Sequence, residues 1–155
     1  MTRTLLIRAT ATDRNSITSV QHFPTPPQSH IAATSPVLIV DDEPSIRDLV
    51  AEYLEFEGIP FIVASNGAEA LEMVSRHPTT SLILLDMRMP IMDGWAFARA
   101  YRKSVANPAP IVTLTAAQDA ASWAREIQAA DYLPKPFDID DLMAVIERTR
   151  RVSTD

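Results

Sequence analysis

The chain has 155 residues, of which 46% are hydrophobic and none is cysteine, and its formal net charge is −6 at pH 7. This length fits one domain with a tail, and the hydrophobic share is sufficient for a core. The absence of cysteine excludes disulfides, thiolate catalysis and cysteine-based metal sites. The acidic balance argues against direct binding to nucleic acid. No run approaches the roughly 18 consecutive apolar residues of a membrane span, so we expect a cytoplasmic protein without membrane association.

Residues 1–35 differ in composition from the rest of the chain. They are rich in threonine, serine, proline and glutamine and show little apolar periodicity. Such a segment buries too little apolar surface to offset the entropy of ordering its backbone. We expect a disordered leader over residues 1–35, a folded domain over 36–150 and a short tail over 151–155. A transit peptide is an alternative interpretation of the arginines near the start, and we favour a solvated tail.

The first strand and helix are expected over residues 37–58. The run VLIVDD (37–42) is apolar and β-branched and ends in two acids. Proline and glycine then flank a segment with apolar residues at i, i+3, i+4, i+7 and i+8, namely Ile46, Leu49, Val50, Tyr53 and Leu54. This spacing predicts an amphipathic helix that begins near Pro44 and ends at Gly58.

The same alternation of strand and helix continues to the end of the domain. The pairs are FIVAS with NGAEALEMVSR, LILLD with DGWAFARAYRK, IVTLT with AAQDAASWAREIQAA, and DYLP with FDIDDLMAVIERTRR. Five such units predict an α/β fold, in which a parallel sheet carries helices on both faces. Open sheets of this kind bind ligands beyond the carboxyl ends of their strands. The chemistry is therefore expected at the strand ends.

Polar side chains stand at four of these strand ends: Asp41 and Asp42, Asp86, Thr115, and Lys135. Each has an ordinary interpretation. Asp42 or Thr115 can cap a helix, Lys135 can be an exposed turn residue, and Asp86 can be a loop acid. Their convergence on one sheet edge carries more weight, because it would place three carboxylates beside a hydroxyl and an ammonium.

Three clustered carboxylates raise one another's pKa unless a cation lies between them. Mg²⁺ with oxygen ligands would relieve that repulsion. A carboxylate beside Mg²⁺, a lysine and a hydroxyl donor is equipped to attack phosphorus and hold the phosphoryl oxygens. The strand ends therefore predict an aspartyl-phosphate site at Asp86.

The motifs LIVDDEPSIRDLV, ASNGAEALEMV, LILLDMRMPIMDGWAF, IVTLTAA and DYLPKPF resemble, in order, the receiver domain of two-component response regulators. The resemblance covers residues 36–150. It implies a flavodoxin-like, doubly wound sheet of five parallel strands in the order 2-1-3-4-5, with five helices. The chain departs from the family at Ala129, where a glycine is frequent.

The resemblance also implies roles for the polar residues at the strand ends. Asp86 would be the phosphoacceptor, with Lys135 and Thr115 contacting the phosphoryl group. Mg²⁺ would be held by Asp86, Asp42 and the main-chain carbonyl of Arg88, with Asp41 acting through water. The bond from Lys135 to Pro136 would be cis.

Further implied roles concern switching and lifetime. Thr115 and Tyr132 would form the switch, and Arg88 and Ala117 occupy positions that tune the lifetime of the phosphoryl group. The donor would be a sensor histidine kinase or a histidine phosphotransfer protein. The domain would be a signalling phosphoacceptor in a phosphorelay, catalysing its own phosphorylation and dephosphorylation, rather than an enzyme acting on other substrates.

The output is expected on the face formed by the fourth helix, fifth strand and fifth helix, over residues 116–148. Because only VSTD follows the last helix and its arginines, we expect a stand-alone receiver that is read by a separate output protein. A phosphorylation-dependent homodimer is left open. Trp123, spaced i, i+4 from Ile127, is expected to pack inward, and Trp95 is expected to be partly exposed.

Two other functions fit parts of the pattern. One is a receiver-like interaction module that docks on a partner without phosphorylation, and the intact set of polar strand ends argues against it. The other is a Mg²⁺-dependent phosphohydrolase with an aspartate nucleophile. Such enzymes usually carry a second aspartate two residues after the nucleophile, where this chain has Arg88.

Overall fold

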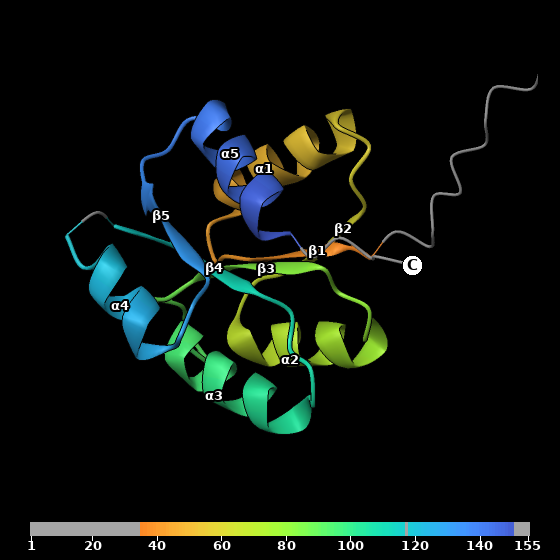
Figure 1. Cartoon of the computed structure of the whole chain (residues 1–155), viewed down its shortest axis with the longest axis vertical. Coiled ribbons are helices and arrows are strands. Elements are labelled where there is room, and N and C mark those ends of the chain that lie inside the picture. The colour runs from red at the N-terminus through yellow and green to blue at the C-terminus, as the bar shows by residue number, and fades with distance from the viewer. Residues whose placement is uncertain (1–34, 117, 151–155) are drawn as a thin grey trace, which may run out of the picture. The chain divides into compact units, whose positions relative to one another are not determined.

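Five strand-then-helix units follow one another in the computed structural model, which describes residues 35–116 and 118–150 (Figure 1). The expected tail, the leader apart from Ser35, and Ala117 lie outside the described residues. The strands are β1 (Val37–Val40), β2 (Phe61–Ala64), β3 (Leu82–Asp86), β4 (Ile111–Ala116) and β5 (Asp131–Lys135). The helices are α1 (Pro44–Phe56), α2 (Gly67–Arg76), α3 (Gly94–Ser104), α4 (Ala120–Glu126) and α5 (Ile139–Thr149).

All five strands are parallel and lie in the order β2-β1-β3-β4-β5. This confirms the predicted strand order. Val40 is paired with Leu85, so the residues that follow them, Asp41 and Asp86, emerge side by side. On the other side of β3, Ala116 of β4 is paired with Lys135 of β5. The ends of four strands thus meet at one edge of the sheet.

Helices cover both faces of the sheet, with α1 and α5 on one face and α2, α3 and α4 on the other (Figure 1). Alternate strand residues point into the two layers. Ile39 and Leu84 pack with α1 and α5, whereas Leu38 and Leu85 pack with α2 and α3. Burial on both faces explains why the strands are continuously apolar.

Helix α1 departs from its predicted apolar stripe at one position. Val50 and Leu54 are fully buried against the sheet, whereas Leu49 is 42% exposed. Leu49 lies about 100° around the helix from Val50, so it is on the flank of the buried face. No helix among the described residues has both the length and the apolar character that crossing a membrane requires.

Candidate functional site

Asp86 ends a strand whose five residues are all buried. The loop after it returns closely enough that Gly94, the first residue of α3, lies against the Asp86 backbone. A Cβ at Gly94 would stand 2.8 Å from the Asp86 carbonyl oxygen and 2.7 Å from Sδ of Met87. The N–H of Gly94 donates to the Met87 carbonyl over 3.0 Å, and Asp93 caps α3 by accepting from the N–H of Ala96 over 2.8 Å. Asp86 is therefore held firmly between a buried strand and a capped helix.

Three carboxylates gather at the end of β1 and β3. Asp41, Asp42 and Asp86 each offer an oxygen, and these oxygens lie within 4.8 Å of one another. Asp41 and Asp86 are buried, whereas Asp42 is exposed and lines the pocket described below. The capping interpretation of Asp42 is wrong: the N-cap of α1 is Glu43, which makes no side-chain cap, and its N–H donates to Oδ1 of Asp41 over 3.0 Å.

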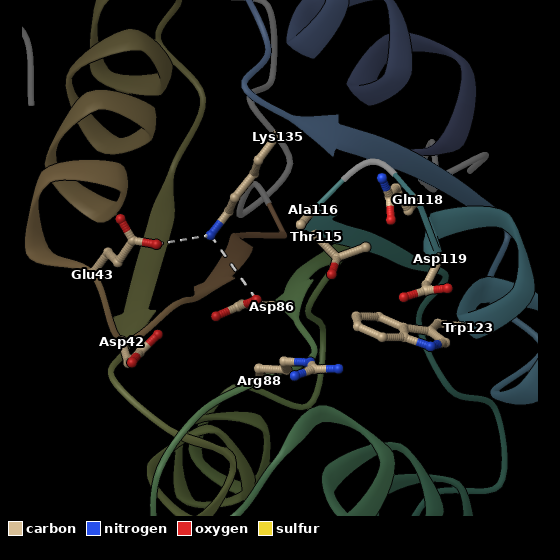
Figure 2. Close-up of a pocket in the computed structure, with 10 residues that line it drawn as sticks. All are labelled: Asp42, Glu43, Asp86, Arg88, Thr115, Ala116, Gln118, Asp119, Trp123 and Lys135. Atoms are coloured by element: carbon tan, nitrogen blue, oxygen red, sulfur yellow. Dashed lines mark ion pairs between the residues drawn. The ribbon is translucent and has the colours of Figure 1, made fainter.

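Lys135 brings a positive charge to these acids from the end of β5. Its Nζ lies 2.7 Å from Oδ2 of Asp41, 3.5 Å from Oε1 of Glu43 and 3.9 Å from Oδ1 of Asp86. The last two ion pairs are drawn in Figure 2. The Lys135–Pro136 bond is cis, as the resemblance implied. One ammonium thus serves three carboxylates.

That single ammonium leaves the acidic cluster short of positive charge. Burial, followed by the charge of Asp41, raises the pKa of Asp86 to about 7, although Lys135 opposes the shift. Burial also raises the pKa of Asp41, despite its hydrogen bond from Lys135. Burial lowers the pKa of Lys135, but the hydrogen bond and charge of Asp41, with the other acids, more than offset this, so its pKa is raised.

The same cluster fits a hard divalent cation. Its donors are carboxylate oxygens, which Mg²⁺ prefers, and Asp42 is open to solvent, so water can complete the coordination. A cation there would favour the ionised form of Asp86 and so oppose the rise in its pKa that burial and the charge of Asp41 cause. The residues present therefore fit the metal that the sequence predicted.

Thr115 completes the polar set from β4. It is only 3% exposed, and it lines with Asp86 and Lys135 a pocket of about 590 Å³ at the sheet edge (Figure 2). Arg88 lines the opposite side of this pocket from Lys135. The structure therefore brings together Asp41, Asp42, Asp86, Arg88, Thr115 and Lys135.

Two predicted positions are not among the residues that line this pocket. Tyr132 is 41% exposed and lines a separate groove, between β5 and α5, with Asp141 and Arg148. Ala117 belongs to the undescribed part of the chain. Tyr132 thus faces outward in this structure, and its expected role as a switch with Thr115 stays a prediction.

Sequence reasoning missed several residues of the pocket. Glu43 directly follows the acidic pair, so a third acid in the DDE motif was a usable signal. Trp123 packs against the core, as expected, but it is only half-buried and also lines the pocket with Gln118 and Asp119. Trp95 is partly exposed, as expected, and contacts Trp123 edge to face, with ring centroids 5.0 Å apart.

Comparison with known proteins agrees with this geometry. The model of the response regulator receiver domain matches residues 37–147. The DNA-binding transcriptional regulator NtrC of Escherichia coli (strain K12) is 41% identical over 115 residues, covering 72% of this chain and 24% of the relative. Response regulator MprA of Mycobacterium leprae (strain TN) is 38% identical over 117 residues, covering 74% and 50%. The chain thus spans half or less of the length of these curated relatives.

Solved structures show the same fold. The chemotaxis response regulator CheY4 of Vibrio cholerae superimposes with a TM-score of 0.68 at 32% identity, covering 75% of this chain and 98% of the other. The receiver domain of Ssk1 of Saccharomyces cerevisiae, solved with the histidine phosphotransfer signaling protein Ypd1, gives 0.69 at 26% identity, covering 76% and 89%. With the matched region spanning all five strands and the assembled acidic pocket, this chain belongs to the response regulator receiver domain family.

Proposed function

We propose that the chain accepts a phosphoryl group on Asp86 in a Mg²⁺-dependent reaction. The observation that carries this proposal is the meeting, in one pocket, of the Asp86 carboxylate with Thr115 and Lys135, beside the acidic pair. A nucleophile, two groups that can hold phosphoryl oxygens and a cation site are the parts that transfer to a carboxylate requires.

Mg²⁺ would be held by Asp42 and Asp86, with the Arg88 main-chain carbonyl, and by Asp41 through water. Bound there, it would neutralise charge on the transferring phosphoryl oxygens and favour the ionised form of Asp86. A carboxyl whose pKa is about 7 in the metal-free protein is only partly ionised at neutral pH. The cation thus sets how much of the protein is competent to react.

The transfer itself exchanges one bond to phosphorus for another. A carboxylate oxygen of Asp86 attacks, and the bond from phosphorus to the donor's imidazole nitrogen breaks with its electron pair staying on the imidazole. Lys135, already 3.9 Å from Asp86, then donates to one phosphoryl oxygen, and the Thr115 hydroxyl donates to another. Asp86 is positioned in advance by β3 and Gly94, so little reorganisation is needed.

The donor is a phosphohistidine on a sensor kinase or on a phosphotransfer protein. Support comes from family membership and from the related Ssk1 receiver domain, which was solved with such a phosphotransfer protein. Because the phosphoryl group of both donors derives ultimately from ATP, the reaction belongs to the cytoplasm. In this role the domain is a signalling phosphoacceptor that also loses its phosphoryl group by its own chemistry.

A separate partner reads the phosphorylated state on the face formed by α4, β5 and α5. Drawing Thr115 toward the phosphoryl group vacates space beside β4, and the exposed Tyr132 side chain turns inward to fill it. Homodimerisation through this face is a further outcome of the switch. Arg88 and Ala117 flank the phosphoryl group and tune its lifetime, Ala117 offering no polar group to guide water.

The proposal is tested by incubating the protein with acetyl phosphate and Mg²⁺ and measuring its intact mass. We expect one phosphoryl group on the wild type, none on Asp86→Asn, and normal labelling of Lys103→Met, which replaces an exposed lysine on α3. Undiminished labelling of Asp86→Asn, or an unlabelled wild type, would contradict the proposal. An unlabelled wild type would favour the phosphorylation-independent interaction module.

Binding of the metal is measured separately from activity. We expect Mg²⁺ to raise the melting temperature of the wild type, because a ligand that binds only the folded state stabilises it. Asp42→Asn removes an exposed ligand and should abolish that increase. Asp48→Asn, an exposed acid on α1, serves as the matched control and should keep it.

A further inference from the structure

A row of three side chains leads away from the pocket toward α3. The guanidinium carbon of Arg88 lies 5.0 Å from the centre of the Trp123 ring. The indole of Trp123, on α4, meets that of Trp95, on α3, at 69° with centroids 5.0 Å apart. Figure 2 shows the Arg88 side chain extended toward the Trp123 indole rather than toward the acids. The row joins the loop after β3 to two helices.

The aromatic end of this row is firmly held. Trp95 and Trp123 are both partly buried and pack against the core on the α2 and α3 side of the sheet. The indole N–H of Trp95 donates to Oε2 of Glu126, one turn along α4 from Trp123, over 2.8 Å. The ring face that Arg88 contacts is thus fixed in place before any ligand arrives.

The cationic end is held only loosely. Arg88 is exposed and takes part in none of the salt bridges formed within residues 35–116 and 118–150. It nevertheless lines the same pocket as Asp86, at the edge of a cluster of carboxylates. An exposed cation at the rim of an anionic pocket thus rests on an aromatic face.

We propose that Trp123 is a positioning residue that holds the Arg88 guanidinium at the rim of the pocket, and that a phosphoryl group on Asp86 draws the guanidinium away from the ring. This inference rests on the proposed phosphorylation of Asp86. A cation–π contact at an exposed site is weak, whereas a guanidinium pairs strongly with phosphoryl oxygens through charge-assisted hydrogen bonds. Adding negative charge at Asp86 therefore shifts Arg88 from one position to the other.

The transfer of Arg88 reports the state of Asp86 to α4. In the unmodified protein the ring of Trp123 carries a bound cation, and in the phosphorylated protein it does not. Because Trp123 contacts Trp95, the loss of the cation from the Trp123 ring alters the contact between α3 and α4. Trp123 also competes with the phosphoryl group for Arg88, so it lowers the affinity of the pocket for phosphoryl-like ligands.

The test is the affinity for beryllofluoride, a phosphoryl analogue, measured by calorimetry in the presence of Mg²⁺. Trp123→Leu keeps an apolar side chain but removes the competing ring face, so we expect binding about two- to fivefold tighter. Arg88→Met should bind more weakly than the wild type. The double variant should match Arg88→Met, because Trp123 acts only through Arg88.

A second readout follows the ring itself. In Trp95→Phe, Trp123 is the only tryptophan, and its emission should change when beryllofluoride binds. Adding Arg88→Met should remove that change, whereas adding Arg99→Met, an exposed arginine on α3, should leave it. Trp123→Phe keeps a smaller aromatic face, so its affinity for beryllofluoride should lie between that of the wild type and the tighter binding of Trp123→Leu.

Two results would overturn the inference while leaving phosphorylation intact. They are a Trp123→Leu effect that persists in the Arg88→Met background, and an emission change that survives the loss of Arg88. A wild type that binds no beryllofluoride while remaining folded would instead overturn the proposed function, and this inference with it.

Discussion

The ammonium of Lys135 donates to the carboxylate of Asp41 over 2.7 Å, and this hydrogen bond joins residues 94 positions apart. The bond connects the end of β5 to the residue that follows β1, and these two strands are separated in the sheet by β3 and β4. Asp41 is fully buried and depends on this partner for its charge. Lys135 is therefore a structural residue as well as a proposed phosphoryl ligand.

Removing that ammonium should destabilise the domain. Lys135→Met leaves the buried Asp41 carboxylate without its cation, and breaking a buried pair in this way costs about 3 kcal/mol of unfolding free energy. We expect this loss at pH 8 and a smaller one near pH 5, because an unpaired Asp41 with a further raised pKa takes up a proton instead. Urea denaturation at the two pH values measures both.

The other lysine of the chain supplies the control for this experiment. Lys103 is exposed on α3, and Lys103→Met should change the unfolding free energy by no more than about 0.5 kcal/mol. Equal stability of the wild type and Lys135→Met at pH 8 would show that the Asp41–Lys135 pair contributes nothing.

Ionisation of Asp86 should cost stability in metal-free buffer. Its pKa rises from 3.8 to about 7 on folding, mainly by burial and then by the charge of Asp41, so between these values the folded state binds more protons than the unfolded state. The free energy of unfolding must then fall as pH rises from about 4 to 7. The rise corresponds to an upper bound of about 4 kcal/mol.

Asp86→Asn removes this titration. At pH 7.5 the unfolding free energy of the variant should exceed that of the wild type, by at most about 4 kcal/mol. Between pH 4 and 7 it should fall less steeply than in the wild type, because the titration of Asp86 is gone. Thermal melts across this range, without divalent cations, provide the comparison. Asp48→Asn should keep the wild-type profile. A variant less stable than the wild type at pH 7.5 would refute this account of Asp86.

Gly94 should be required for the position of Asp86. In Gly94→Ala the added carbon would press on backbone atoms of Asp86 and Met87 that cannot move freely. We expect a loss of about 1–3 kcal/mol of unfolding free energy and slower labelling by acetyl phosphate, because the loop after β3 that carries the proposed phosphoacceptor must shift. Denaturation and intact mass follow the two effects.

Gly58 provides the contrast. It has φ 69°, and open space surrounds the position of its missing Cβ. Gly58→Ala should therefore lower the unfolding free energy by about 1 kcal/mol, because alanine is strained at this φ. Its labelling by acetyl phosphate should not change. Equal labelling rates in the two alanine variants would show that the contact of Gly94 does not position Asp86.

Gln128 should be a site of stabilisation. It follows the C-cap of α4 with φ 54°, in the left-handed region that glycine adopts without strain. Gln128→Gly should raise the unfolding free energy by about 1 kcal/mol, while Ala129→Gly should not. Chemical denaturation distinguishes the two neighbours, and the opposite ranking would place the strain at Ala129.

The sequence was sufficient to predict the fold and the meeting of the polar residues at the strand ends, because the carboxyl ends of parallel strands lie at one edge of the sheet whatever the details of packing. It was not sufficient where a side chain had two available faces. The spacing of Trp123 and Ile127 indicates a shared inward flank, and both residues do pack on the core, but it does not show that Trp123 also reaches the pocket. In the same way, Leu49 fits the apolar stripe of α1 yet lies at its exposed margin.

The position of Tyr132 was inaccessible to sequence reasoning for another reason. Its expected role as a switch with Thr115 came from a resemblance to domains that change state on phosphorylation, and a pattern of residues does not specify which state one structure shows. In this structure Tyr132 lies outside, on an edge strand, beside Arg148. The resemblance noted only that Ala129 stands where the family often has glycine, whereas the residue with left-handed backbone is its neighbour Gln128, with φ 54°.

The long sequence separation between Asp41 and Lys135 also has a consequence during synthesis of the protein. While the chain is being synthesised, Asp86 leaves the ribosome before Thr115 and well before Lys135. A nascent chain therefore carries the proposed nucleophile without the groups that would hold a phosphoryl group on it. Parallel strands pair late because their partners are distant in sequence. A phosphohistidine donor would thus meet a complete pocket only in a fully synthesised domain, and incomplete chains would not accept a phosphoryl group.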